Sequence, residues 1–319
     1  MDELVVAVDL GGTLIRTAIL DREGNVTARV VRLTKAEEGL SPVLRRIKEA
    51  IHETLAQVPL HKIKAIGVGS PGPLDPFRGV VRSASNLPGW LDVPLRAILE
   101  EEFSLPVHLG NDANVAALAE RLFGGGKGLD NLIYLTISTG IGGGIIADGK
   151  LLLGAEGLAA EVGHMVLEPE GPRCTCGQLG CLQALASGIA IAREAAGAVE
   201  SGAKTLIGEL VGGDTSKISA RVVSQAATEG DEMALKILGR AGFYIGLGIV
   251  NLVHLFNPQA VIIGGGVSKA GPLLFDPIRQ TVRERALPPY QTELTIQPSA
   301  LGDDVGLLGA AALALTAEG

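Results

Sequence analysis

The N-terminal part of the chain alternates between apolar runs and short polar turns. Residues 4–9 (LVVAVD) form an apolar run typical of a buried strand, GGT predicts a turn, and residues 14–20 (LIRTAIL) predict a second strand before DREGN turns again. We therefore expect a β-hairpin with glycines at its tip.

Helices and strands follow each other in the next hundred or so residues. Apolar residues at helical spacing predict helices over 42–57 and 94–103, and residues 63–72 and 107–111 are typical of strands. The segment NLPGW (86–90) predicts a loop, and NDANVAALAERLFG begins an alanine-rich helix. This alternation indicates an α/β fold.

The strand, glycine turn, strand pattern occurs a second time. Residues 131–137 (NLIYLTI) and 145–154 (IIADGKLLLG) predict two strands, which are joined by the turn STGIGGG (138–144). A similar unit that occurs twice suggests two related halves facing each other across a cleft.

The C-terminal half continues the alternation. We predict helices over 184–200, 219–230 and 231–256, an exposed loop at 211–217, a buried strand over 260–271 that ends in three glycines, and a closing helix over 301–317.

Composition narrows the class of protein. A length of 319 residues with 47% hydrophobic and 19% charged residues fits a globular protein of two domains. The net charge of −8 comes without a basic cluster, so we expect no nucleic-acid or membrane partner. The apolar run at 245–256 looks too short to span a bilayer, and the acidic start of the chain does not resemble a signal peptide, so we expect a cytoplasmic protein.

Three glycine-rich turns follow predicted strands: DLGGT, STGIGGG and IGGG. Glycine leaves backbone N–H groups unhindered, which suits such turns to phosphate binding. Neither the GxxxxGK[ST] motif nor a GxGxxG motif within a βαβ unit occurs there. Such a turn alone is more often merely structural, so the argument rests on the combination of the three turns.

Asp112 lies where a predicted strand gives way to a helix, at an edge of the sheet that faces ligands in open α/β folds. One interpretation is a helix N-cap, the commonest use of Asp at this place. The other is a general base that accepts a hydroxyl proton during phosphoryl transfer.

Glu161 and His164 are three residues apart and would share one face of a helical segment.

His164 is also the first of four potential zinc ligands in a short stretch. His164, Cys174, Cys176 and Cys181 match a Cys3His tetrahedral zinc site, and the alternative is a set of buried thiols. Because four protein ligands leave no open position, the zinc is expected to be structural.

Together these segments resemble the ROK family of sugar kinases and repressors, and bacterial glucokinases most of all. DLGGT, SPGPLD, NLPGW, NDAN, STGIGGG, EVGHM, CTCGQLGCLQ and IIGGG occur in the order of the family, over essentially the whole chain. The resemblance implies an actin-like ATPase (ribonuclease H-like) fold, with two α/β domains around a central cleft. It also implies a homo-oligomer, a dimer or a tetramer. The domains would comprise residues 1–112 plus about 302–319, and residues 113–301.

The resemblance also implies roles for individual residues. Asp112 would be the catalytic base that deprotonates the 6-hydroxyl of the sugar, and Asp9 would help to hold Mg²⁺, which acts with ATP. The sugar would contact Gly72, Asn111, Asp112, Glu161, His164 and Gln183. ATP would contact Gly11, Gly12, Thr13, Thr139, Gly140, Gly264, Gly265 and Gly266. His164 would have two roles, with one ring nitrogen on Zn²⁺ and the other toward the sugar.

Two positions depart from the family pattern. Leu14 replaces the lysine of GGTK, so any contact of that lysine is lost or replaced. Gln183 replaces the glutamate that is a sugar ligand in the family. Glutamine keeps an acceptor oxygen but loses the charge, so we expect weaker binding or a shifted sugar preference rather than inactivity.

The leading hypothesis is an ATP-dependent glucokinase that makes glucose 6-phosphate, a reaction of glycolysis. An alternative is a ROK kinase for mannose, fructose, N-acetylmannosamine or N-acetylglucosamine. A sugar-responsive repressor would need an N-terminal DNA-binding segment, which we do not expect here because a strand is predicted from residue 4. A non-catalytic sugar-binding relative is suggested by Leu14 and Gln183, whereas Asp112, Asn111 and Glu161 argue against it.

Overall fold

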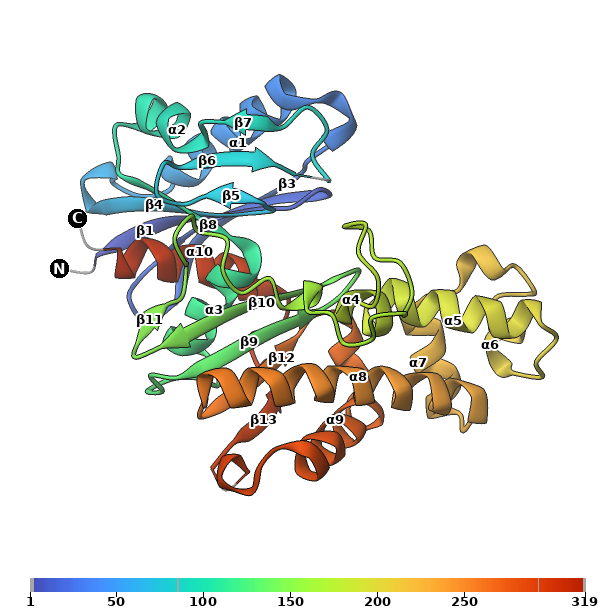
Figure 1. Ribbon diagram of the computed structural model, residues 1–319. Helices are drawn as coiled ribbons and strands as arrows, with labels where there is room; N and C mark the ends of the chain where they lie inside the picture. Colours follow the sequence, from blue (N-terminus) through green and yellow to red (C-terminus); the bar gives the residue numbers. More distant parts are fainter. Residues whose placement is uncertain (1–2, 85, 292, 318–319) are drawn as a thin grey trace. The chain divides into compact units, whose positions relative to one another are not determined.

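The computed structural model describes residues 3–84, 86–291 and 293–317, and it has the alternating strands and helices of an α/β fold. The chain forms two compact units (Figure 1). The first comprises Met1–Asp130, Gly144–Ala160 and Ala300–Gly319, and the second comprises Asn131–Gly143 and Glu161–Ser299. The expected boundary at residue 112 differs from this division, because the helix that follows it packs against the C-terminal helix in the first unit. Residues 318–319 of the expected first domain lie outside the described residues.

The first unit is built on a five-stranded sheet with the order β3-β2-β1-β4-β8. The predicted hairpin is confirmed, since β1 and β2 pair antiparallel, with Asp9 opposite Arg16. β3 joins β2 antiparallel, whereas β4 and β8 extend the sheet as parallel strands on the other side of β1. The strands are β1 Leu4–Leu10, β2 Leu14–Leu20, β3 Val26–Leu33, β4 Ile63–Ser70 and β8 Val107–Asn111.

Helices cover both faces of this sheet (Figure 1). α1 (Leu40–Leu55) and α2 (Leu95–Phe103) bury one face, where their apolar residues form one core with Val6 and Val8. α10 (Val305–Thr316) covers the other face and packs against α3 (Asp112–Phe123). The approach of α10 is close, because a Cβ at Gly67 of β4 would lie only 1.8 Å from the carbonyl oxygen of Ala310. Glycine at this strand position is therefore required by helix packing.

A small antiparallel sheet of three strands was not predicted. It consists of β5 Leu74–Asp75, β6 Val80–Ser83 and β7 Leu91–Val93. Short 3-10 turns complete the unit at η1 Ala36–Glu38, η2 Leu60–Lys62 and η7 Gly302–Asp304.

The second sheet repeats the strand order of the first. Its order is β11-β10-β9-β12-β13, which matches β3-β2-β1-β4-β8 strand by strand and confirms the predicted internal repeat. The strands are β9 Leu132–Ile137, β10 Ile141–Ala147, β11 Lys150–Leu151, β12 Ala260–Gly264 and β13 Thr295–Pro298. The predicted turn over 138–144 is shorter than expected, because β10 already begins at Ile141.

The helices of the second unit differ from prediction in two places. The predicted helix over 184–200 is divided at Ser187, whose side chain accepts a hydrogen bond from the N–H of Ala190 and so begins a new helix. α9, which includes Pro277 in its interior, was not predicted. The helices are α4 Leu182–Ala186, α5 Gly188–Glu200, α6 Leu206–Leu210, α7 Ala220–Thr228, α8 Glu232–Phe256 and α9 Pro272–Arg285, with 3-10 turns η3 Val162–His164, η4 Thr215–Lys217, η5 Gly266–Ala270 and η6 Pro288–Tyr290.

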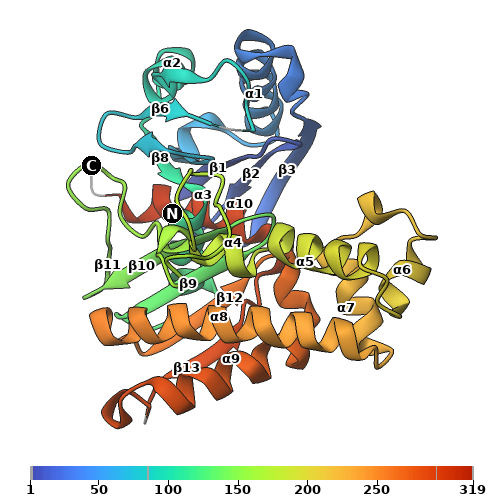
Figure 2. The ribbon, with the colours of Figure 1, turned by 45° about the vertical axis from the view of Figure 1, so that its right-hand side comes forward.

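α8 is the longest helix described and lies along α9 (Figure 2). It is longer than the predicted apolar run, and its length and composition would suit a membrane span. More than half of its most apolar part is buried in the protein, however. Gly242 and Gly246, one turn apart, allow α9 to approach, since Cβ atoms there would lie 2.8 Å from Pro277 and 2.6 Å from Thr281. α8 therefore has the contacts of a core helix.

Candidate functional site

The first glycine turn connects β1 to β2. The N–H of Gly11 donates to the carbonyl of Leu14 at 2.9 Å, which closes the turn. A Cβ at Gly12 would lie 3.0 Å from the Asn86 side chain, so glycine allows this loop of the NLPGW segment to approach. Thr13 is exposed at the tip. The turn thus has the small residues and exposed edge that its predicted phosphate role requires.

Asp9 lies at the end of β1, next to this turn. Its carboxylate accepts a hydrogen bond from Arg16 at 3.2 Å, and a Cβ at Gly306, in the first turn of α10, would lie 2.8 Å from its Oδ1. Burial raises the pKa of the Asp9 carboxyl above its ordinary value, while the Arg16 guanidinium opposes this shift. A carboxylate oxygen is a ligand that Mg²⁺ prefers, so Asp9, beside the first glycine turn, fits the predicted ion.

Arg16 was not predicted as part of the site. Leu14 and Arg16 are two residues apart on β2 and therefore face the same side of the sheet. Arg16 also donates to the carbonyl of Asp303 at 3.0 Å, which fixes its guanidinium next to Asp9. The register of the predicted hairpin, with residue 9 opposite residue 16, was the signal that could have identified it.

Asn111 and Asp112 lie at the junction of β8 and α3. Asn111 is the N-cap, because its backbone is extended and its side chain accepts from the N–H of Ala113 at 3.0 Å. Asp112 is the first residue of the helix, is exposed, and accepts from the same N–H at 2.8 Å. Asn111 therefore takes the N-cap role that one of the two interpretations gave to Asp112. The positive end of the α3 dipole favours a negative charge at Asp112.

Gly72 and Asn111 lie side by side in the first unit. β4 and β8 are parallel neighbours with Ser70 opposite Asn111, and Gly72 follows β4. A Cβ at Gly72 would lie 3.0 Å from the Asn111 amide nitrogen. The structure thus gathers three of the predicted sugar contacts, Gly72, Asn111 and Asp112, at one edge of the first sheet.

The second glycine turn and the IGGG segment leave neighbouring strands of the second sheet. β9 and β12 are parallel, with Thr136 opposite Gly264, so the turn at Thr139 and Gly140 and the run Gly264–Gly266 emerge at the same edge. Gly265 has a positive φ of 87° and lies against the carbonyl of Ile137, which explains why it is glycine. These five predicted nucleotide contacts are therefore grouped within one unit.

Glu161 and His164 share one face of a 3-10 turn, as predicted for residues three apart. Their side chains approach to 4.0 Å between Oε2 of Glu161 and Nε2 of His164. The other ring nitrogen, Nδ1, faces Cys174 Sγ at 3.7 Å. One nitrogen is therefore directed to the cysteine cluster and the other to Glu161, and the sugar contact expected for this histidine stays a prediction.

The donor atoms of His164, Cys174, Cys176 and Cys181 all lie within 4.8 Å of one another. The Sγ atoms of Cys176 and Cys181 are 3.7 Å apart, far beyond the length of a disulfide bond. In a tetrahedral site with Zn–S bonds of about 2.3 Å, ligand atoms are separated by about 3.7 Å. The cluster therefore fits a four-ligand zinc ion, and Gly177 and Gly180, with φ of 94° and 68°, provide the tight turns that bring the ligands together.

The electrostatics of the cluster also suit a cation. Burial opposes ionisation of Cys174, but the N–H of Cys176 and the Gln183 amide lower the pKa of its thiol to about 6. Burial and the neighbouring Cys176 and Cys174 raise the pKa of the Cys181 thiol to about 12. Ionised Cys174 and Cys181 side by side need a counter-charge, which a metal ion bound there would supply.

Gln183 lies between the cysteine cluster and the second glycine turn. Its amide nitrogen donates to Cys174 Sγ at 3.3 Å and to Thr175 Oγ1 at 3.2 Å. Its amide oxygen lies 3.5 Å from the N–H of Ile141 and is 3.0 Å from a Cβ position at Gly140. The partner Thr175 was not predicted, and the sugar contact expected for Gln183 stays a prediction.

Comparisons with known proteins extend over nearly the whole chain. A model of the ROK family matches residues 5–317. A glucokinase of Thermotoga maritima is 40% identical over 97% of this chain and 96% of its own length, and a xylose repressor of Caldicellulosiruptor bescii is 33% identical over 98% of this chain and 78% of the repressor. A ROK family glucokinase from Streptomyces griseus, solved in complex with glucose and AMPPNP, is 35% identical and matches with a TM-score of 0.84 over 98% of this chain and 100% of the other. The similarity therefore includes both units.

Proposed function

This chain belongs to the ROK family, and we propose that it is an ATP-dependent glucokinase that transfers the γ-phosphoryl group of ATP to the 6-hydroxyl of glucose. The products are ADP and glucose 6-phosphate. The observation that carries the proposal is the exposed Asp112 carboxylate beside Asn111 and Gly72, in a chain similar to a glucokinase over 97% of its length.

Asp112 acts as the general base in this mechanism. As the 6-oxygen of glucose attacks the γ-phosphorus in line with the leaving ADP, the hydroxyl proton moves to a carboxylate oxygen of Asp112. Ala113, whose N–H binds Asp112 Oδ1 at 2.8 Å, keeps that carboxylate in place. Asn111 and Gly72 bind the sugar next to it, so the 6-hydroxyl is oriented before the reaction.

The glycine turns hold the phosphate groups of ATP through backbone N–H groups. In the first unit Gly12 and Thr13 offer their N–H groups, while the N–H of Gly11 closes the turn by donating to Leu14. Thr139, Gly140 and Gly264–Gly266 serve in the second unit. Asp9 would help to hold Mg²⁺, which would neutralise charge on the phosphoryl group when bound with ATP.

The zinc ion has a structural role in this proposal. His164, Cys174, Cys176 and Cys181 would hold it with four ligands, which would leave no position for water or sugar. Bound there, the zinc would fix the ring of His164, whose Nε2 lies 4.0 Å from Oε2 of Glu161, and these two side chains are the sugar contacts proposed for this unit.

A panel of sugars distinguishes this proposal from the kinase alternatives. With saturating ATP and Mg²⁺, glucose is expected to give the highest kcat/KM among glucose, mannose, fructose, N-acetylmannosamine and N-acetylglucosamine. A higher kcat/KM for one of the other sugars would assign that sugar instead and keep the reaction class.

Replacing Gln183 with glutamate restores the charged acceptor of the family pattern. We expect the KM for glucose to fall several-fold with kcat retained, because a hydroxyl bound to a charged group is worth about 1.5–3 kcal/mol against about 1 kcal/mol for a neutral one. Steady-state kinetics measures this effect, and Gln178→Glu, which adds the same charge at an exposed position of the same loop, is the matched control. An unchanged KM would show that Gln183 is no handicap for sugar binding.

We further propose that the protein is cytoplasmic and forms a homo-oligomer. Light scattering after size-exclusion chromatography is expected to give two or four times the chain mass of 32.8 kDa. A mass equal to one chain at micromolar concentration would contradict the oligomer.

A further inference from the structure

One buried residue holds two backbone carbonyls of the first glycine turn. Thr34, which directly follows β3, donates its N–H to the carbonyl of Thr13 at 2.8 Å and its hydroxyl to the carbonyl of Gly11 at 2.6 Å. Its exposed fraction is 0%. The carbonyls of Gly11 and Thr13 are therefore directed toward Thr34 within the first unit.

The direction of these carbonyls matters for an anion. A carbonyl oxygen carries a partial negative charge and repels a phosphate, whereas a backbone N–H attracts it. In a turn that binds phosphate, the carbonyls must therefore point away from the ligand and the N–H groups toward it. Thr34 does this for Gly11 and Thr13, and leaves the amides of Gly12 and Thr13 as the donors that the turn can offer.

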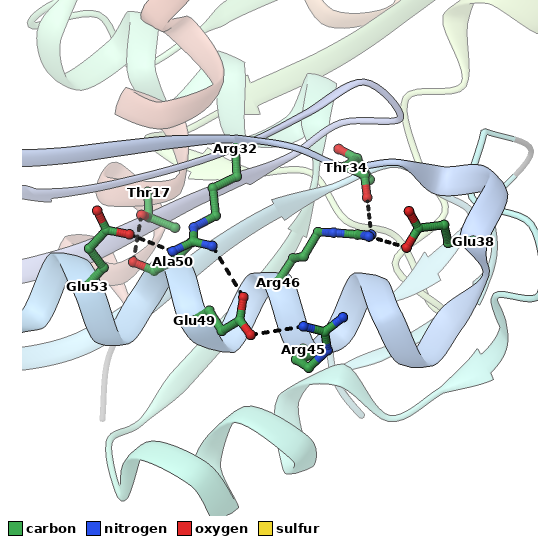
Figure 3. Close-up of polar contacts among 9 residues, drawn as sticks. All are labelled: Thr17, Arg32, Thr34, Glu38, Arg45, Arg46, Glu49, Ala50 and Glu53. Carbon is green, nitrogen blue, oxygen red and sulfur yellow. Dashed lines mark hydrogen bonds and ion pairs between the residues drawn. The ribbon is translucent and has the colours of Figure 1, made fainter.

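Thr34 is itself bound by Arg46 of α1 (Figure 3). Its guanidinium donates to the Thr34 carbonyl at 2.9 Å and also binds the Glu38 carboxylate. The Arg46 side chain is only 12% exposed, whereas that of its neighbour Arg45 is 64% exposed and binds Glu49 on the same helix. A buried guanidinium is stable only with such partners, which indicates that Arg46 has a fixed place at Thr34.

We propose that Thr34, fixed by Arg46, is a positioning residue for the phosphate groups of ATP. It keeps the carbonyls of Gly11 and Thr13 away from the nucleotide, so that the first glycine turn presents N–H groups to the phosphates. Because Thr34 is fully buried, it acts through the turn and does not touch ATP. This inference rests on the proposed kinase function.

Three variants of Thr34 and its partner test the inference. Thr34→Val keeps the shape but removes the hydroxyl donor to Gly11, and is expected to raise both the KM for ATP and the Kd of a non-hydrolysable ATP analogue about tenfold. The KM for glucose is expected to stay within about twofold of the wild type, since the sugar contacts lie elsewhere. Thr34→Ser, which retains the hydroxyl, is expected to restore nucleotide binding.

Arg46→Met removes the guanidinium and is expected to weaken nucleotide binding in the same direction, while Arg45→Met at the exposed neighbouring position leaves it unchanged. Steady-state kinetics measures the KM values, isothermal titration calorimetry with the ATP analogue measures the Kd values, and thermal melting confirms that each variant is folded. Equal nucleotide affinity of the wild type, Thr34→Val and Arg46→Met overturns this inference and leaves the proposed kinase function standing. A wild-type protein that binds no ATP analogue overturns the proposed function and this inference with it.

Discussion

Replacing Asp112 with asparagine is expected to lower kcat for glucose phosphorylation by about 10²–10⁴-fold, the usual contribution of a general base. Asparagine cannot accept the proton of the 6-hydroxyl at neutral pH. Its side-chain oxygen can still accept the hydrogen bond from the N–H of Ala113, so α3 should begin as before. The melting temperature and the KM for ATP are therefore expected to stay close to those of the wild type.

Asp92→Asn is the control for this experiment. Asp92 is an exposed aspartate of the same unit whose left-handed backbone, with φ of 49°, asparagine also adopts readily. Kinetics with saturating ATP and glucose should show full activity for Asp92→Asn. Activity of Asp112→Asn within about threefold of the wild type would exclude Asp112 as the base, because so small a loss is below the usual contribution of a general base.

Removing the zinc site is expected to have the largest effect on stability. Cys181 is fully buried, and its replacement by serine takes away one of four ligands. We expect the purified wild type to contain about one zinc ion per chain and Cys181→Ser to contain almost none. Loss of a structural metal costs several kcal/mol of folding free energy, which corresponds to a fall in melting temperature of roughly 10 °C for a domain of this size.

The same variant should affect sugar binding more than nucleotide binding. Without the metal the ring of His164 is no longer fixed, so the KM for glucose is expected to rise. Thr175→Ser, between two ligands, retains a hydroxyl for Gln183 and should keep both the zinc and the stability. Elemental analysis and thermal melting provide the readouts. A wild type that contains no metal, or whose melting temperature is unchanged by a chelator, contradicts the zinc site.

Much of the fold follows from local patterns. The two strand, turn, strand segments were readable because their apolar runs are bounded by glycines, and the shared strand order of the two sheets confirms that they are related. β3 was missed because Val26, Val31 and Leu33 are apolar but exposed, which hides the alternation of a half-buried strand. α9 was missed because Pro277 in its interior normally indicates a break.

The site was predictable where its residues are close in the sequence. The cysteine cluster and its histidine lie within one short segment, so their spacing alone indicated a metal site. Contacts between distant segments could not be read in this way. Thr34 meets Gly11, 23 residues away, and Gln183 meets Ile141, 42 residues away, because packing of separate elements brings them together.

The most direct test of the central claim is the identity of the product. The purified protein is mixed with glucose, ATP and Mg²⁺, and the phosphorylated species are followed by ³¹P and ¹H NMR. The account predicts that ADP and glucose 6-phosphate appear in equal amounts with the wild type and that Asp112→Asn forms almost none. Absence of any sugar phosphate with glucose and with every other hexose of the panel would contradict it.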